Sequence, residues 1–152
     1  MDSMKKILRA SSIAAALALA GCKLTMDVPS KFIVIDHGMH EIRAMSPDQA
    51  RLSVLDLGDN KEGDLTFWSE AMRNDFQGNR GYALVEERKV KDAAGRDGAE
   101  SVWETTLDGT AQRYLATLFI VGSRVRVAEY LAPKAIFEKY LEDVRKAIAT
   151  LR

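Results

Sequence analysis

Apolar and polar residues alternate along much of the chain after residue 30. This period of two is typical of half-buried β-strands. The pattern predicts strands over residues 40–45, 51–57, 82–91, 100–107 and 124–131, and a β-branched run over residues 31–36 and an apolar run over residues 112–121 predict two more. Asp108-Gly109 and Gly122-Ser123 are typical of tight turns, so the strands that they join are predicted to be antiparallel. The run 112–121 is the most apolar, and we expect it near the centre of a sheet.

Two other segments have a helical period. The first follows a predicted N-cap at Asp64 and carries apolar residues three or four positions apart: Leu65, Trp68, Met72 and Phe76. The second spans residues 135–151, just after Pro133, and its apolar stripe comprises Ile136, Phe137, Tyr140, Leu141, Val144, Ile148 and Leu151. Both helices are therefore predicted to pack on the sheet through one face.

The order of these elements defines a fold class. Strands, a helix, four consecutive strands and a final helix indicate an α+β domain. We expect an antiparallel sheet of about six to seven strands covered by two amphipathic helices, one on each face. Trp68 and Trp103 are expected in the core.

The N-terminal segment has a different pattern. Lys5, Lys6 and Arg9 precede an uncharged stretch over residues 10–20. A positive start, a short apolar stretch and small residues before a cleavage point are typical of a secretory signal peptide. A membrane-spanning helix needs roughly 20 apolar residues, so this stretch is too short to remain as a transmembrane segment. Whether translation starts at Met1 or at Met4 is left open by the sequence.

The end of this segment, Leu19-Ala20-Gly21-Cys22, resembles the lipobox of bacterial lipoproteins. The resemblance implies cleavage between Gly21 and Cys22, and addition of lipid to the cysteine. Cys22 is the only cysteine, so an intramolecular disulfide is excluded. The alternative is an ordinary signal peptide with a chance cysteine.

The residue after Cys22 is Lys23 rather than the aspartate that favours the inner membrane in enteric lipoproteins. The resemblance therefore implies the outer membrane, facing the periplasm.

These features divide the chain into three parts. Residues 1–21 are predicted to be a cleaved signal, residues 22–30 a short linker from the lipidated cysteine, and residues 31–152 one α+β domain. Residues 1–21 hold three of the 22 basic and one of the 22 acidic residues, which leaves the mature chain a net charge of about −2. Because nucleic-acid-binding domains carry a basic face, this charge argues against a nucleic-acid partner.

The order of elements also resembles the PsbP-like fold, which includes DcrB-type bacterial lipoproteins and a nuclear-import factor that binds the GTPase Ran. The resemblance covers residues 31–152 and rests on the helix that carries Trp68, on Gly81-Tyr82 at the start of a strand, on residues 118–125 and on the C-terminal helix. The Pro-x-x-Trp opening common in such families is missing. The family has no shared catalytic residues, so the resemblance implies binding to a partner rather than catalysis.

Metal-ligand chemistry is suggested at one position. His37 and His40 are the only histidines, and Glu41 follows them directly. Zinc and copper bind imidazole and carboxylate groups, so this turn is a weak candidate metal site. The metalloprotease motif would need a histidine at position 44, where the chain has Ala44. A polar turn between two strands is the simpler interpretation.

The other candidates are weaker. Acidic residues gather in a loop that could suggest calcium, namely Asp56, Asp59, Glu62 and Asp64, but they lack the spacing of a helix–loop–helix calcium site. The chain has no Gly-x-Ser-x-Gly motif and no phosphate-binding loop. We expect no cofactor and no catalytic residue. The leading hypothesis is a non-enzymatic, membrane-tethered domain that binds an unknown protein partner. The alternative is a small metal-dependent envelope enzyme that uses His37 and His40.

Overall fold

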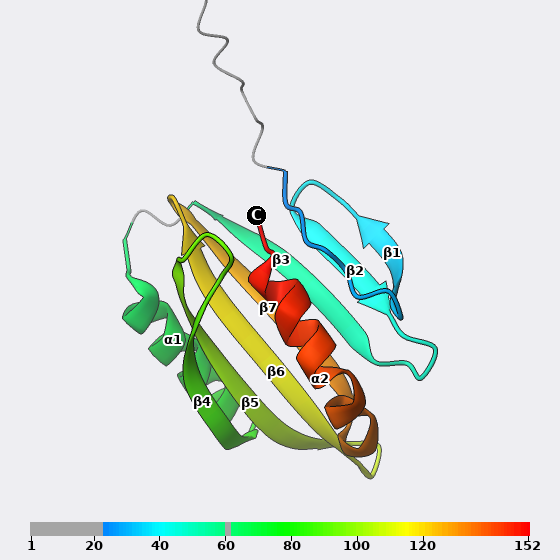
Figure 1. Cartoon of the computed structure of the whole chain (residues 1–152). Helices are drawn as coiled ribbons and strands as arrows, with labels where there is room; N and C mark the ends of the chain where they lie inside the picture. The colour runs from blue at the N-terminus through cyan, green and yellow to red at the C-terminus, as the bar shows by residue number, and fades with distance from the viewer. Residues whose placement is uncertain (1–22, 60–61) are drawn as a thin grey trace, which may run out of the picture.

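In the computed structural model, one antiparallel sheet of seven strands forms the centre of the molecule (Figure 1). The structure describes residues 23–59 and 62–152, so the predicted signal peptide and Cys22 lie outside it. The strand order is β1-β2-β3-β7-β6-β5-β4, and every neighbouring pair is antiparallel. The predicted fold class is confirmed.

The strands correspond closely to the alternating segments of the sequence. Their bounds are β1 Ile33–His37, β2 Glu41–Met45, β3 Arg51–Asp59, β4 Ala83–Lys91, β5 Asp97–Leu107, β6 Thr110–Val121 and β7 Arg124–Pro133. The apolar run expected at the centre is β6, which lies beside the central strand β7. Strand β1 is irregular, with a shift of register between Val34 and Asp36.

The two helices cover opposite faces of this sheet, as predicted (Figure 1). Helix α2, Lys134–Ala149, packs on β7 and β6 through buried residues that include Phe137, Tyr140 and Val144. Helix α1, Leu65–Asn74, continues into a π-helical turn, Asp75–Asn79, and covers the other face over β5 and β6. In the described part of the chain, no helix is long and apolar enough to cross a membrane.

Helix α1 begins as the sequence indicates but is less buried than α2. The Asp64 side chain accepts a hydrogen bond from the backbone N–H of Phe67 at 2.9 Å, which confirms the predicted N-cap. No residue of α1 is fully buried, and Trp68 is half-buried. Trp103 on β5 is completely buried against Phe76, with the two rings edge to face. The prediction for Trp103 is thus confirmed, whereas Trp68 lies at the margin of the core.

Residues 23–30 do not form the linker that the sequence suggested. Leu24 is 0% exposed, and it packs with Met26 and Phe32 into the same core as α2. Thr25 and Arg152 also exchange two backbone hydrogen bonds, at 3.0 and 2.9 Å. The packed core therefore includes Leu24 and Met26 and does not start at residue 31. The alternation of apolar and polar residues did not reveal this packing, because a single extended segment at the edge of a core needs only a few apolar residues.

One close approach in the sheet depends on glycine. A Cβ atom at Gly98 would lie 2.4 Å from Cε1 of Phe119 and 3.0 Å from the backbone oxygen of Leu118. Phe119 is buried and has little freedom to move away. Only glycine leaves room for this ring beside β5.

We therefore expect Gly98→Ala to lower the free energy of unfolding by about 1–3 kcal/mol, because the ring must leave its packed position. Urea unfolding monitored by circular dichroism measures this change. Gly78→Ala is the matched control, since nothing lies within 4 Å of a Cβ at that position. Equal stabilities of the two variants would contradict this account of Gly98.

Candidate functional site

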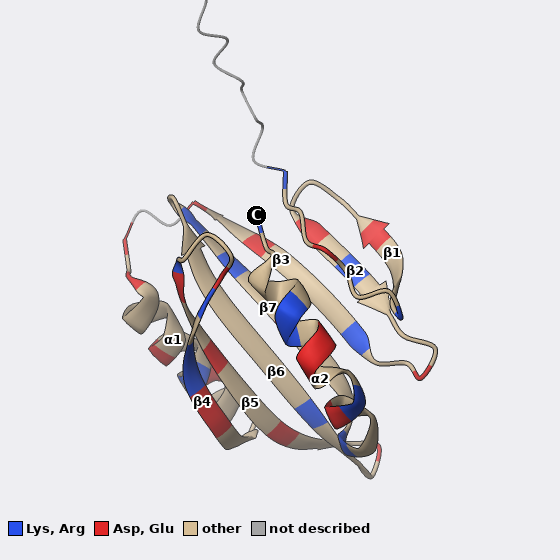
Figure 2. Ribbon diagram, in the orientation of Figure 1, with Lys and Arg blue, Asp and Glu red and all other residues tan. Residues whose placement is uncertain are grey.

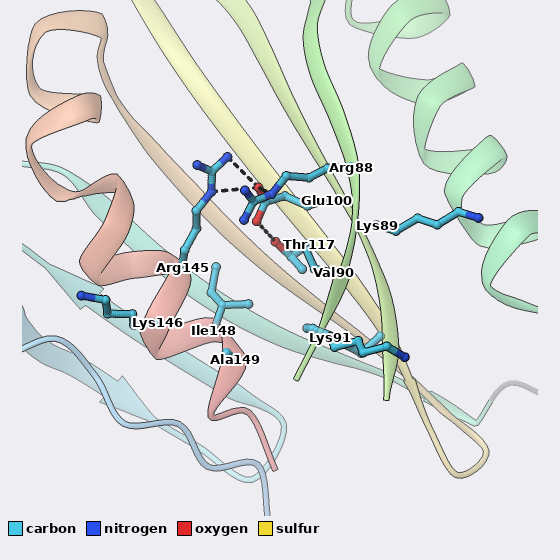
Figure 3. A pocket seen from close by; sticks show the side chains of 11 residues that line it. Arg88, Lys89, Val90, Lys91, Glu100, Thr117, Arg145, Lys146, Ile148 and Ala149 are labelled. Atoms are coloured by element: carbon cyan, nitrogen blue, oxygen red, sulfur yellow. Dashed lines mark hydrogen bonds and ion pairs between the residues drawn. The ribbon is translucent and has the colours of Figure 1, made fainter. Parts of the chain in front are cut away.

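A cavity of about 430 Å³ opens between helix α2 and the edge strand β4 (Figure 3). It exists because α2 packs over β7 and β6 and leaves the neighbouring strands β5 and β4 partly uncovered. Its apolar floor includes Val90, Phe119 and Ile148, and its basic residues are Arg88, Lys89, Lys91, Arg145 and Lys146.

The centre of this cavity is the buried carboxylate of Glu100 on β5, which is 4% exposed. Figure 3 shows that Arg88 from β4 and Arg145 from α2 converge on it. Nε of Arg88 lies 2.8 Å from Oε1 of Glu100, and Nη2 of Arg145 lies 2.8 Å from the same oxygen. The hydroxyl of Thr117 donates to the second oxygen at 3.5 Å. Glu100 thus connects the sheet edge to α2.

These contacts indicate what the cluster does chemically. Burial alone would lower the pKa of Arg145, but its hydrogen bonds to Glu100 and the charge of Glu86 raise the pKa above the usual value. The oxygens of Glu100 are already engaged by two guanidinium groups and by the Thr117 hydroxyl, and charge-assisted contacts of this kind are strong. The cluster is therefore suited to holding α2 and β4 together rather than to acid–base catalysis.

The basic residues of the cavity do not create a strong anion site. Lys91 pairs with Asp97 at 2.5 Å, and Arg145 also approaches Glu86 and Glu142 at 3.4 Å each. Most of the positive charge is therefore neutralised nearby, and Figure 2 shows acidic and basic residues on β4 beside acidic residues on β5.

A second cavity, of about 680 Å³, lies on the opposite face between α1 and the strands β4 and β5. Leu65, Ser69 and Met72 line its helical side. Its floor is low because β5 presents the small residues Ala99 and Ser101 there. An ion pair between Arg73 and Glu87, with atoms 2.5 Å apart, bridges the rim. Its lining also includes charged residues, and those at Glu70, Arg73 and Lys89 are exposed.

The two edges of the sheet differ sharply in chemistry. Strand β4 carries charges at most positions, namely Glu86, Glu87, Arg88, Lys89 and Lys91. Strand β1 instead exposes three consecutive branched residues: Ile33 at 72%, Val34 at 45% and Ile35 at 61%. We call Ile33, Val34 and Ile35 the apolar edge of β1. Because an unpaired strand edge invites another chain, proteins usually protect it with charges. The edge at β4 has that protection, and the apolar edge of β1 does not.

The structure does not bring the two histidines into a metal site. Nε2 of His37 lies 3.1 Å from the backbone oxygen of Leu24, and Nδ1 of His40 lies 3.5 Å from the guanidinium of Arg124. Glu41 pairs with Arg43 at 3.0 Å. Among residues 23–59 and 62–152, no three histidine, cysteine or acidic residues are grouped as metal ligands. The geometry gives no support to the metal hypothesis for His37, His40 and Glu41.

The acidic loop also has structural partners. Asp64 caps α1, and Asp59 accepts a hydrogen bond from the hydroxyl of Ser123 at 3.1 Å. The side chain of Asp56 is completely buried, and its Oδ2 lies 2.7 Å from Nε of Arg124 and 3.4 Å from Nε of Arg126. Glu62 is exposed. These contacts favour the interpretation as an ordinary loop over calcium binding.

Comparison with known proteins gives a likeness in fold alone. No family model and no curated protein matches the sequence. The solution structure of cyanobacterial PsbP (CyanoP) from Synechocystis matches with a TM-score of 0.60 and 9% identity, over 92% of this chain and 98% of that one. The fold is PsbP-like.

Two further solved structures have this fold. The Saccharomyces cerevisiae Ran-binding protein Mog1p matches with a TM-score of 0.60 and 11% identity, over 88% of this chain and 92% of that one. LpqN, involved in cell envelope biogenesis of Mycobacterium tuberculosis, matches with a TM-score of 0.55 and 14% identity, over 84% and 82%. The chain spans 44% of a Bacteroides thetaiotaomicron protein that it matches at 20% identity with a TM-score of 0.52, over 85% of its own length.

Neither the Glu100 cluster nor the apolar edge of β1 was predicted from the sequence. A signal for Glu100 exists, because it alternates in phase with the buried Val102 and therefore faces α2. No comparable signal marks the edge, since a run of Ile and Val is equally typical of a buried strand.

Asp56 provides a test of the buried charges. Its burial raises the pKa, but hydrogen bonds from Arg124 and from the backbone N–H of Gly58 outweigh it and hold the pKa below the usual range. We expect Asp56→Asn to lower the free energy of unfolding at pH 7 by about 3–5 kcal/mol, because Arg126 then remains buried without a counter-charge. Urea unfolding at several pH values measures this effect.

The pH dependence has a defined sign. The stability that Asp56 contributes is fully present above about pH 4, the usual aspartate pKa, and is lost as the pH falls through the lower pKa of the folded state. The difference between the native protein and the variant should therefore shrink in acid. Asp36→Asn is the control, because the half-exposed pair of Asp36 with Arg43 contributes less than about 1 kcal/mol. A difference that grows in acid would contradict this assignment.

Proposed function

We propose that this protein is a lipid-anchored component of the bacterial cell envelope, whose PsbP-like domain binds a protein partner without catalysing a reaction. The partner is proposed to supply an extended segment with apolar side chains, and the apolar edge of β1 is proposed to receive it. Attachment is through lipid on Cys22, at the outer membrane and facing the periplasm.

The observation that carries the binding role is the chemistry of β1. Its three branched side chains are exposed, and its outer edge has no neighbouring strand among residues 23–59 and 62–152. An extended segment can add to such an edge through main-chain hydrogen bonds, while its side chains cover the apolar residues. Strand β4 is matched in position at the other edge but is charged, which disfavours the same mode of binding there.

Several further observations support this proposal. The lipobox-like residues Leu19 to Cys22 follow a signal-like segment, and Lys23 rather than aspartate follows the cysteine. One solved structure of similar fold is described as involved in cell envelope biogenesis and another as a Ran-binding protein, which supports an envelope location and a binding role. The buried acids Asp56 and Glu100 are each held by arginine side chains. This arrangement supports binding over acid–base chemistry.

We expect Cys22→Ala to abolish incorporation of labelled palmitate in cells, because the thiol that accepts the lipid is gone. The measurement is radiolabelling followed by immunoprecipitation. Ser3→Ala, a change within the predicted signal that leaves Cys22 in place, should label normally. Palmitate retained by the Cys22→Ala protein would refute lipidation at this residue.

Photo-crosslinking in cells tests the binding edge. A photoreactive amino acid at Val34 should form a defined adduct with another protein. The same residue at Val85 is a close control, because Val34 is 45% exposed and Val85 is 46% exposed at the opposite edge. We expect the adduct yield at Val34 to exceed that at Val85 by about tenfold, the selectivity expected from a difference of about 1.4 kcal/mol. Equal yields at the two positions would refute the proposed edge.

A further inference from the structure

The distance between the predicted lipid site and the folded domain is very short. Leu24 is completely buried, and only Lys23 lies between it and Cys22. Two residues of chain span at most about 7 Å. A lipid on Cys22 therefore leaves the domain no free tether. One particular part of its surface must lie next to the headgroups, whichever way the rest of the domain is oriented.

The surface around Lys23 is formed by segments that are far apart in the sequence. The backbone N–H of Leu24 donates to the oxygen of Met39 at 3.4 Å, and Thr25 is bonded to Arg152. The backbone N–H of Ala93, in the loop between β4 and β5, donates to the oxygen of Ala149 at 2.7 Å. Figure 1 shows the start of the described chain, the C-terminus and this loop at the same end of the sheet. We call Lys23, Met39, Ala93, Ala94 and Arg152 the tether end.

The chemistry of the tether end is compatible with a lipid surface. Met39 is 67% exposed although it is apolar, and Ala93 and Ala94 are exposed small residues. Lys23 adds a positive charge beside the attachment point. The positive charge of Arg152 is balanced by Asp27, 3.1 Å away. An apolar side chain gains free energy when it leaves water for the interfacial region, and basic residues are attracted to anionic headgroups.

From this geometry we infer that the tether end lies against the membrane, with Met39 in the interfacial region of the bilayer and the strands of the sheet directed away from it. The inference rests on the proposed lipidation of Cys22. It adds the surface that contacts lipid. The opposite end, at the turn between β5 and β6, is then remote, because the 12 residues of β6 span about 40 Å.

The experiment uses the mature protein purified from cells with its lipid, placed in vesicles of phosphatidylethanolamine and phosphatidylglycerol that contain nitroxide-labelled lipid. Lipidation occupies the thiol of the only native cysteine, so Met39→Cys provides a single site for a fluorophore. Leu107→Cys is the matched control, since Leu107 is exposed, apolar and next to the turn at the opposite end. Mass spectrometry of the N-terminal peptide reports the state of Cys22 in the same samples.

We expect lipid nitroxides to quench the label at position 39 at least about twofold more than the label at position 107, because interfacial groups lie only about 5–10 Å deep. Equal quenching at the two positions, or stronger quenching at position 107, in a protein with lipidated Cys22 would overturn the orientation alone. An unmodified Cys22 would overturn the anchoring, and the orientation with it.

Discussion

The burial of helix α2 on the sheet is the interaction on which the rest of the structure depends. Tyr130 of β7 stacks on Phe137 of α2 with ring centroids 4.8 Å apart, and its hydroxyl donates to the backbone oxygen of Phe137 at 3.1 Å. Leu24 and Phe32, from the start of the domain, complete the same core. The first and last segments of the domain are therefore held by one apolar cluster. Helix α2 covers only one face of the sheet. The other face carries Trp103 and its apolar neighbours, so α1 is needed to cover them.

Buried charges at the margins of this core determine how the layers align. Glu100 joins β5 to α2 and β4, and Asp56 joins β3 to β7. Such pairs add little net stability relative to apolar residues, but breaking one is costly. One Nη1 atom, that of Arg126, is buried without a hydrogen-bond partner among the described residues. The arginines thus favour one register of helix and strands over alternatives that would leave a charge uncompensated.

The fold could be predicted from the sequence largely because its periodicity is unambiguous. Alternation in residues 51–57 and the stripe from Ile136 to Leu151 each match one type of element only. The candidate site was not predictable to the same degree. The exposure of Ile33 depends on which strands lie at the sheet edges, and the partners of Glu100 lie 12 and 45 positions away. Residues 23–30 were misjudged because their packing depends on a core formed by distant segments.

Lys23 is joined directly to the buried Leu24 without a flexible linker, and this has a consequence for where the protein can act. With the proposed lipid on Cys22, the domain would be held directly on its membrane, would search for partners in two dimensions and would not bridge the space to another layer of the envelope. If its strands run perpendicular to the membrane plane, the five residues of β1 form an exposed edge about 17 Å long that faces parallel to that plane. A partner segment that pairs with it must then also run along the membrane normal. That requirement favours partners fixed in the same bilayer over freely diffusing peptides, because such peptides approach β1 in random orientations.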